Sequence, residues 1–356
     1  MRRAAETALQ ARATTLYFGG GTPALLAPAD VARLIAAARR WLALTPDAEI
    51  TLEANPGPLD ASRLAALRQA GVNRLSLGVQ SAHPAELAVL GRGHSWEDVA
   101  RAARQARAGG WDNLSLDLIF GLPGQTLAQW RHTLDAVLAL EPEHLSLYGL
   151  TLEPGTPLAQ AVASGAHPAP DPDLAADMYL AASEDLHNAG FWQYEISNWA
   201  RGAHSALEVW ALPPAGETER IGPVSRHNLA YWRNTAWLGV GAGSHSWWGG
   251  SRWHNVCHPR DYIAALAAER SPIAESEVIS TALERGETMM MGLRLAEGVN
   301  AARFEVRFGV ALAATYAEAL NRWQAAGLLV WDGARARLHR RGRLLGNQVF
   351  GDFLPD

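Results

Sequence analysis

Thr15-Leu16-Tyr17-Phe18-Gly19-Gly20-Gly21-Thr22-Pro23 is the stretch from which the rest of the chain can be interpreted. Its first four residues are β-branched, aliphatic or aromatic, and they predict a short buried strand. The three glycines leave bare backbone N–H groups, which can bind carboxylate or phosphate oxygens of a ligand. The alternative is a glycine-rich turn that binds nothing. The stretch lacks the Gly-Lys-Ser/Thr of a phosphate loop and the Gly-x-Gly-x-x-Gly spacing of a dinucleotide site.

Strand-like and helix-like segments alternate five times in the first 150 residues. This rhythm predicts an α/β fold with parallel strands and crossover helices, arranged as an open sheet or a barrel. The predicted strands cover residues 15–18, 49–53, 74–80, 114–120 and 144–150, and the predicted helices cover residues 29–42, 60–70, 84–90, 96–108 and 126–140.

Three polar residues interrupt otherwise apolar strands at or near their carboxyl ends: Glu53, Gln80 and Asp117. In a barrel the ligand site lies at this end of the strands, next to the glycine turn. A single such residue can serve as a structural acceptor for loop N–H groups. Three at equivalent positions of successive units predict one lined pocket.

Composition narrows the class of protein. The chain has 356 residues and a net charge of −5, which argues against nucleic acid as a partner. No apolar run approaches the roughly 18 residues of a membrane span, and the start lacks a signal-peptide core, so we expect a cytoplasmic protein. Cys257 is the single cysteine, which excludes an intrachain disulfide and the several thiolates of an iron–sulfur cluster.

The alternation ends after Thr151. Residues 202–225 have little periodicity and predict a surface loop or an insertion. The next segment is rich in histidine and tryptophan, which suits either heme binding or a tryptophan-rich core with histidines at its rim. From about Ser280, three helices, expected over residues 282–291, 301–308 and 311–326, and a two-stranded ribbon predict a small winged-helix-like domain. Five arginines make this ribbon basic: Arg335, Arg337, Arg340, Arg341 and Arg343. The basic ribbon is either a wing that contacts phosphate groups or a solvated charged surface.

Seven stretches follow one another along the chain: Tyr17-Phe18-Gly-Gly-Gly-Thr-Pro23, Glu53-Ala-Asn-Pro56, Asn73-Arg-Leu-Ser-Leu-Gly-Val-Gln-Ser81, Leu90-Gly-Arg-Gly-His94, Asp117-Leu-Ile-Phe-Gly-Leu-Pro-Gly-Gln125, Tyr194-Glu-Ile-Ser-Asn198 and His227-Asn-Leu-Ala-Tyr-Trp232. In this order they resemble the radical S-adenosylmethionine superfamily, in its oxygen-independent coproporphyrinogen III oxidase-like branch, and within it the heme chaperone HemW family.

The resemblance implies a partial (β/α) radical-SAM barrel and the family's small C-terminal domain, with boundaries expected at 1–200, 201–279 and 280–356. It implies that S-adenosylmethionine (SAM) contacts these residues: Gly20, Gly21, Thr22, Glu53, Gln80, Arg92 and Asp117. It also makes His227 the candidate heme-iron ligand, beside Tyr231 and Trp232, with His245, His254 and His258 as competitors.

The implied function is a heme chaperone that passes heme to an acceptor protein, and a homodimer is possible. The rival is a coproporphyrinogen III dehydrogenase. The family's first strand and its Cys-x-x-x-Cys-x-x-Cys loop, which holds a [4Fe–4S] cluster, are absent from this sequence. The barrel is therefore expected to lack its first strand, and we expect an upstream start site to supply both.

Overall fold

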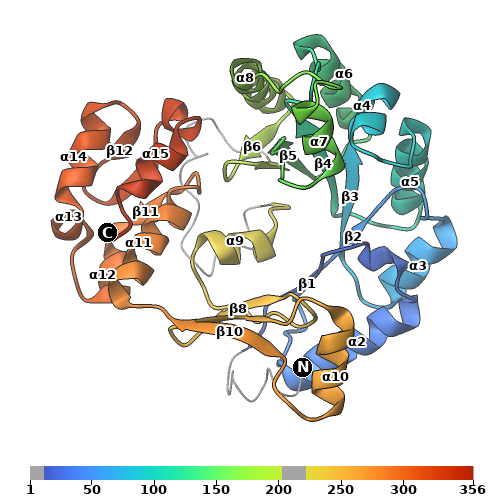
Figure 1. Ribbon diagram of the computed structural model, residues 1–356, viewed down its shortest axis with the longest axis horizontal. Coiled ribbons are helices and arrows are strands. Elements are labelled where there is room, and N and C mark those ends of the chain that lie inside the picture. Colours follow the sequence, from blue (N-terminus) through green and yellow to red (C-terminus); the bar gives the residue numbers. More distant parts are fainter. Residues whose placement is uncertain (1–11, 203–221, 356) are drawn as a thin grey trace. The chain divides into compact units, whose positions relative to one another are not determined.

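The computed structural model describes residues 12–202 and 222–355 (Figure 1). Most of the loop expected at residues 202–225 lies outside the described residues. The chain forms two compact units, of which one comprises Thr14–Ala36 and Pro46–Val224. The other is built mainly from Ser225–Asp356 and also takes Ala37–Thr45. The three-part division expected from the sequence stays a prediction.

One sheet dominates the first unit, with the strand order β1-β2-β3-β4-β5-β7-β6. Its strands are β1 (Thr15–Phe18), β2 (Glu49–Ala54), β3 (Arg74–Gln80), β4 (Leu114–Phe120), β5 (His144–Gly149), β6 (Phe191–Gln193) and β7 (Asn198–Arg201). From β1 to β5 each strand pairs in parallel with the next along the chain, whereas β7 pairs antiparallel with β5 and β6. In a (β/α) barrel, neighbouring strands follow one another in chain order, whereas the strand order of a doubly wound sheet reverses partway across the sheet. The order of β1 to β5 is therefore that of a barrel. The predicted partial (β/α) barrel is confirmed, with β1 at the end of the strand order.

Helices connect the strands of this sheet. They are α2 (Pro28–Trp41), α3 (Ala61–Gln69), α4 (Pro84–Val89), α5 (Trp96–Ala108), α6 (Leu127–Leu138), α7 (Pro157–Ala163) and α8 (Pro172–Asn188), with the short 3-10 helix η1 (Pro23–Leu25) after the glycine turn. Figure 1 shows α3, α5 and α6 along the outer side of the strands. Ser95 and Thr126 close capping boxes at the starts of α5 and α6, which satisfy the first backbone N–H groups of each helix.

The two faces of the parallel sheet differ in chemistry, because successive side chains of a strand point to opposite faces. The apolar set on β3 and β4 is completely buried: Leu75, Leu77, Leu114, Leu116 and Leu118. The alternate positions on the same strands carry serine and aspartate. The apolar face forms the core, and the polar face is available for a site.

The second unit contains two three-stranded antiparallel sheets, in the orders β10-β9-β8 and β11-β13-β12. The strands are β8 (His245–Trp248), β9 (Ser251–Asn255), β10 (Ile273–Val278), β11 (Val299–Asn300), β12 (Leu329–Trp331) and β13 (Arg335–Leu338). The helices are α9 (Arg226–Trp232), α10 (Pro259–Ala267), α11 (Thr281–Gly292), α12 (Ala301–Phe308), α13 (Leu312–Thr315), α14 (Ala317–Ala325) and α15 (Gly346–Gly351), with the 3-10 helix η3 (Arg340–Arg343).

The C-terminal helices and antiparallel strands are present as expected, with three differences in detail. The helix predicted over residues 311–326 is interrupted at Tyr316, where φ is −124° and ψ is 29°. The predicted two-stranded ribbon gains β11 as a third strand. The sheet of β8, β9 and β10 was not predicted from the sequence. None of the helices in the described part of the chain is both long and apolar enough to span a bilayer.

Candidate functional site

The glycine turn after β1 presents open backbone. Gly20 has φ of +109°, a conformation that glycine adopts far more readily than other residues, and a Cβ at Gly20 or Gly21 would meet no atom within 4 Å. Thr22 closes the turn, and its hydroxyl accepts a hydrogen bond of 3.2 Å from the amide of Asn55 on the chain after β2. The turn is therefore fixed at its end while its middle can be approached by a ligand.

Glu53 on β2 is bound directly to this turn. The Gly20 N–H donates to its carboxylate, and the Tyr17 hydroxyl donates to Oε1 at 2.6 Å. Burial and the nearby charge of Asp117 raise the pKa of Glu53, while the Tyr17 and Gly20 donors act in the opposite direction. Burial and the Glu53 carboxylate likewise raise the pKa of Tyr17.

Asp117 lies on β4, on the same face of the sheet as Glu53. Serine hydroxyls from three strands donate to its carboxylate: Ser76 at 2.8 Å, Ser115 at 3.2 Å, and Ser146. Burial raises the pKa of Asp117, and these donors and the charge of Arg74 oppose that shift. Asp117 keeps part of its surface accessible, so it is both anchored and open to a ligand.

Gln80 ends β3 at an irregularity in the pairing with β4 and has a left-handed φ of +67°. Its Nε2 lies 3.0 Å from the position of a Cβ on Gly78, which pairs with Asp117, so the Gln80 side chain turns back along this part of β3. Arg92 follows α4, and its N–H donates to the Leu87 carbonyl at 2.9 Å. Among the described residues, no hydrogen bond or ion pair links the Arg92 side chain to Glu53, Gln80 or Asp117.

It was not predicted from the sequence that serines surround Asp117, although a repeated triplet in the sequence indicates them. The triplet Leu-Ser-Leu recurs in three consecutive strands, as Leu75-Ser76-Leu77, Leu114-Ser115-Leu116 and Leu145-Ser146-Leu147. Ser115 also bonds the Nδ1 of buried His144 at 2.8 Å, while the His144 Nε2 lies 2.9 Å from the Tyr194 hydroxyl. Burial holds the pKa of His144 well below its usual value, which makes the ring a neutral part of the network.

The raised pKa of Glu53 gives a pH-dependent stability. The folded state holds this proton more tightly than the unfolded state, so the stability contributed by Glu53 falls as pH rises from its unfolded pKa through its folded pKa. We expect the melting temperature of the wild type, relative to Glu53→Gln, to fall as pH rises above about 4, the ordinary pKa of a glutamate side chain. Thermal melts of both proteins at increasing pH above this value check the prediction, with Glu184→Gln on the exposed side of α8 as the control. A difference that rises with pH would refute it.

Helix α9 in the second unit carries the histidine motif. Ser225 caps this helix by accepting from the Asn228 N–H. The His227 Nε2 lies 3.2 Å from the Tyr231 hydroxyl, and the two rings meet edge to face at 5.1 Å between centroids. Tyr231 in turn contacts Trp237 at 4.9 Å. His227, Tyr231 and Trp237 therefore form a continuous, partly exposed aromatic surface around an imidazole.

Trp232 does not join this surface. Its ring lies under the Arg294 guanidinium, 5.1 Å from the centroid, and no ring contact links it to His227 in the described part of the chain. The competing histidines lie elsewhere in the same unit: His245 and His254 face each other across β8 and β9 at 5.2 Å, and His258 caps α10.

Two family models match parts of this chain. The Radical SAM superfamily matches residues 1–137, and the HemN C-terminal domain matches residues 284–345. The heme chaperone HemW of Bacillus subtilis is 36% identical over 343 residues, which cover 96% of this chain and 86% of that protein. HemW of Mycobacterium tuberculosis is 38% identical over 335 residues, covering 94% and 79%.

This chain belongs to the HemW family.

The HemW fold is also that of a solved relative. The structure of Escherichia coli coproporphyrinogen III oxidase HemN, a radical SAM enzyme, matches with a TM-score of 0.79 at 22% identity, covering 98% of this chain and 81% of that chain. At this level of identity the likeness concerns the fold alone.

Radical SAM membership implies SAM and a [4Fe–4S] cluster as family cofactors. The donor set around the glycine turn fits SAM, because open backbone amides and two carboxylates suit its carboxylate, ammonium and hydroxyl groups. The cluster does not fit these residues: Cys257 is the single cysteine of the 356 and is exposed, and the described residues contain no group of three or more His, Cys, Asp or Glu able to hold a metal ion.

Proposed function

We propose that this protein is a heme chaperone that binds heme and passes it to an acceptor protein. The observation that carries the proposal is the 36% identity to a HemW heme chaperone over 96% of the chain, a span that includes α9. A chaperone needs a heme site that is accessible as well as ligating. The partly exposed imidazole of His227 beside aromatic rings has both properties.

His227 is the proposed axial ligand of the heme iron. A neutral imidazole nitrogen is a common iron ligand, and aromatic faces pack on a flat macrocycle. Tyr231 lies one helical turn from His227 and can orient its ring through the 3.2 Å contact to Nε2. Tyr231 and Trp237 are the adjacent aromatic surface, and Trp232 supports the helix from another side.

SAM is the proposed ligand of the glycine turn. Gly20, Gly21 and Thr22 would contact its methionine end, and the carboxylates of Glu53 and Asp117 would accept from its ammonium or hydroxyl groups. Gln80 and Arg92 would complete the pocket, with the Arg92 guanidinium as a partner for the SAM carboxylate. The two carboxylates are already oriented by Tyr17 and by the serines, so binding needs little rearrangement on the protein side.

Transfer and turnover assays test the function. Hemin-loaded protein is mixed with apomyoglobin as a surrogate acceptor, and the rise of the myoglobin spectrum is followed. We expect heme to leave the loaded protein for the acceptor, and we expect no oxidation of coproporphyrinogen III by the same preparation under anaerobic conditions with SAM and a reductant. Turnover of coproporphyrinogen III would favour the dehydrogenase and contradict the chaperone.

A further inference from the structure

The end of α9 is fixed by the helices that follow it in the second unit. Asn234 lies directly after the helix, is 1% exposed, and has a left-handed φ of +49°. Asparagine tolerates this conformation better than most residues, but neighbouring groups must hold it. Its own N–H donates to the Tyr231 carbonyl at 2.9 Å, so the fixed residue is bonded to the turn that carries the proposed heme residues.

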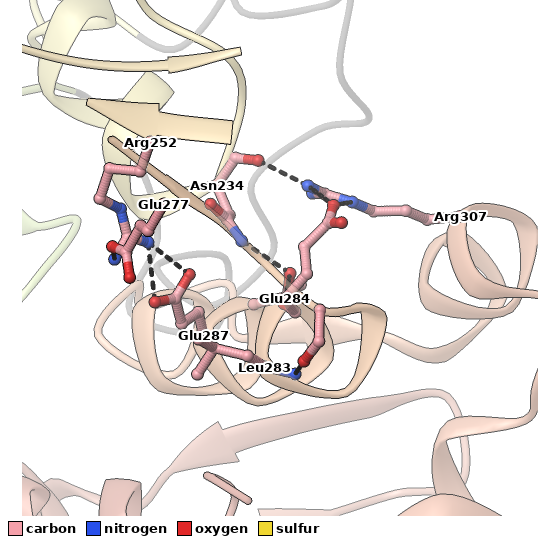
Figure 2. Close-up of polar contacts among 9 residues, drawn as sticks. Asn234, Arg252, Glu277, Leu283, Glu284, Glu287 and Arg307 are labelled. Carbon is pink, nitrogen blue, oxygen red and sulfur yellow. Dashed lines mark hydrogen bonds and ion pairs between the residues drawn. The ribbon is translucent and has the colours of Figure 1, made fainter. Parts of the chain in front are cut away.

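Two side chains hold Asn234 from opposite ends. The Asn234 Nδ2 donates to the Thr288 hydroxyl on α11 at 3.0 Å. The Arg307 guanidinium on α12 donates to the Asn234 carbonyl at 2.9 Å (Figure 2). Arg307 also forms an ion pair of 2.7 Å with Glu284 on α11. The side-chain nitrogen and the backbone carbonyl of this buried residue are thereby bound to the same pair of helices.

Helix α11 is itself anchored to the adjoining sheet. Glu287, which is 7% exposed, accepts two hydrogen bonds of 2.7 Å from Arg252 on β9, and Arg252 also pairs with Glu277 on β10 (Figure 2). This contact is costly to break, because the largely buried Glu287 carboxylate would lose two charge-assisted hydrogen bonds. The helix that binds the Asn234 side chain is therefore itself bound to the β8–β10 sheet.

The two residues before Asn234 are bound by the same part of the chain. Arg233 pairs with Glu297 at 2.9 Å, and both side chains are largely buried. The Arg294 guanidinium lies between the rings of Trp232 and Phe350, at 5.1 Å and 5.0 Å from their centroids. Three consecutive residues at the end of α9 are thus fixed by C-terminal side chains.

We infer that Thr288 and Arg307 are positioning residues for His227: they fix Asn234, and through it the direction of α9 and of the proposed heme ligand. This inference rests on the proposed function. It assigns the C-terminal helices a role in heme ligation that they perform without contacting the heme.

Thr288→Val tests the inference, since it keeps the shape of the side chain and removes the hydroxyl. The substitution removes the hydroxyl's bond to Asn234 and its bond of 2.7 Å to the Glu284 carbonyl within α11. In heme-free protein we expect amide hydrogen exchange over residues 229–235 to accelerate about tenfold, the factor that the lost bond to Asn234 supports. In hemin-loaded protein we expect an altered Soret band and heme dissociation faster by a similar factor. Thr288→Ser retains the hydroxyl and should restore both. Arg307→Met provides a second variant that removes the bond to the Asn234 carbonyl.

The matched control is Arg322→Met, which breaks two surface ion pairs in the same unit, with Asp352 and with Glu318. It should leave exchange in α9 and the Soret band unchanged, so that general destabilisation is separated from positioning. If Thr288→Val and Arg307→Met both keep wild-type exchange rates and spectra, the positioning inference is wrong, while the proposed function is unaffected. A wild-type Soret band in His227→Ala would overturn the ligand assignment and this inference together.

Discussion

His227→Ala is expected to lower the affinity for heme by at least about 100-fold, the upper end of the effects seen when only the surroundings of a metal ligand are changed. The imidazole supplies the proposed bond to iron, and alanine leaves Tyr231 and Trp237 able to pack on the macrocycle but not to replace that bond. The Soret band should shift accordingly. The fold should survive, because the His227 side chain is partly exposed and is not part of the core.

The competing histidines provide the controls for this experiment. His245→Ala, His254→Ala and His258→Ala should each leave the Soret band unchanged, with a small loss of stability for the last because His258 caps α10. Equilibrium titrations with hemin give the affinities of all four variants. A wild-type spectrum in His227→Ala together with a lost band in one of the others would transfer the assignment to that residue.

Asp117→Leu is expected to destabilise the first unit by about 3 kcal/mol, since three serine hydroxyls lose their acceptor at roughly 1 kcal/mol each. The change also removes the carboxylate that offsets the charge of buried Arg74. Asp117→Asn retains the shape of the side chain and part of its hydrogen bonding, so we expect this variant to fold. We expect it to bind SAM at least about tenfold more weakly, which is the loss expected when a hydrogen bond to a charged group is removed.

Chemical denaturation measures the first effect, and equilibrium dialysis with SAM measures the second. Asp112→Asn is the control, because Asp112 precedes β4 and its side chain is 85% exposed. Its stability should stay within about 0.5 kcal/mol of the wild type. An Asp117→Leu protein as stable as the wild type would show that the serine network contributes little. Unchanged SAM affinity in Asp117→Asn would remove Asp117 from the proposed pocket.

The parallel sheet and part of its polar face were predictable because each depends on a short-range pattern. Strands such as Leu114–Phe120 are apolar runs bounded by turn signals, and Asp117 stands out in one of them. Glu53 and Asp117 could be placed together because the carboxyl ends of parallel strands meet at one end of a barrel. The partners Tyr17 and Ser146 were missed, since a hydroxyl within a strand is an ordinary strand residue until its register is known.

The β8–β10 sheet illustrates why other parts were not predictable. All six residues of β10 are exposed, so its sequence lacks the alternation that a half-buried strand shows. Trp232 is adjacent to Tyr231 in the motif, but neighbouring residues on a helix point about 100° apart. Whether they share a surface therefore depends on tertiary packing, here on Arg294.

Titration of the purified wild-type chain with hemin tests the central claim most directly. We expect saturable binding of one heme per chain, with a Soret band characteristic of histidine ligation that is lost in His227→Ala. Absorbance that rises without saturation, with the spectrum of free hemin throughout, would contradict the account.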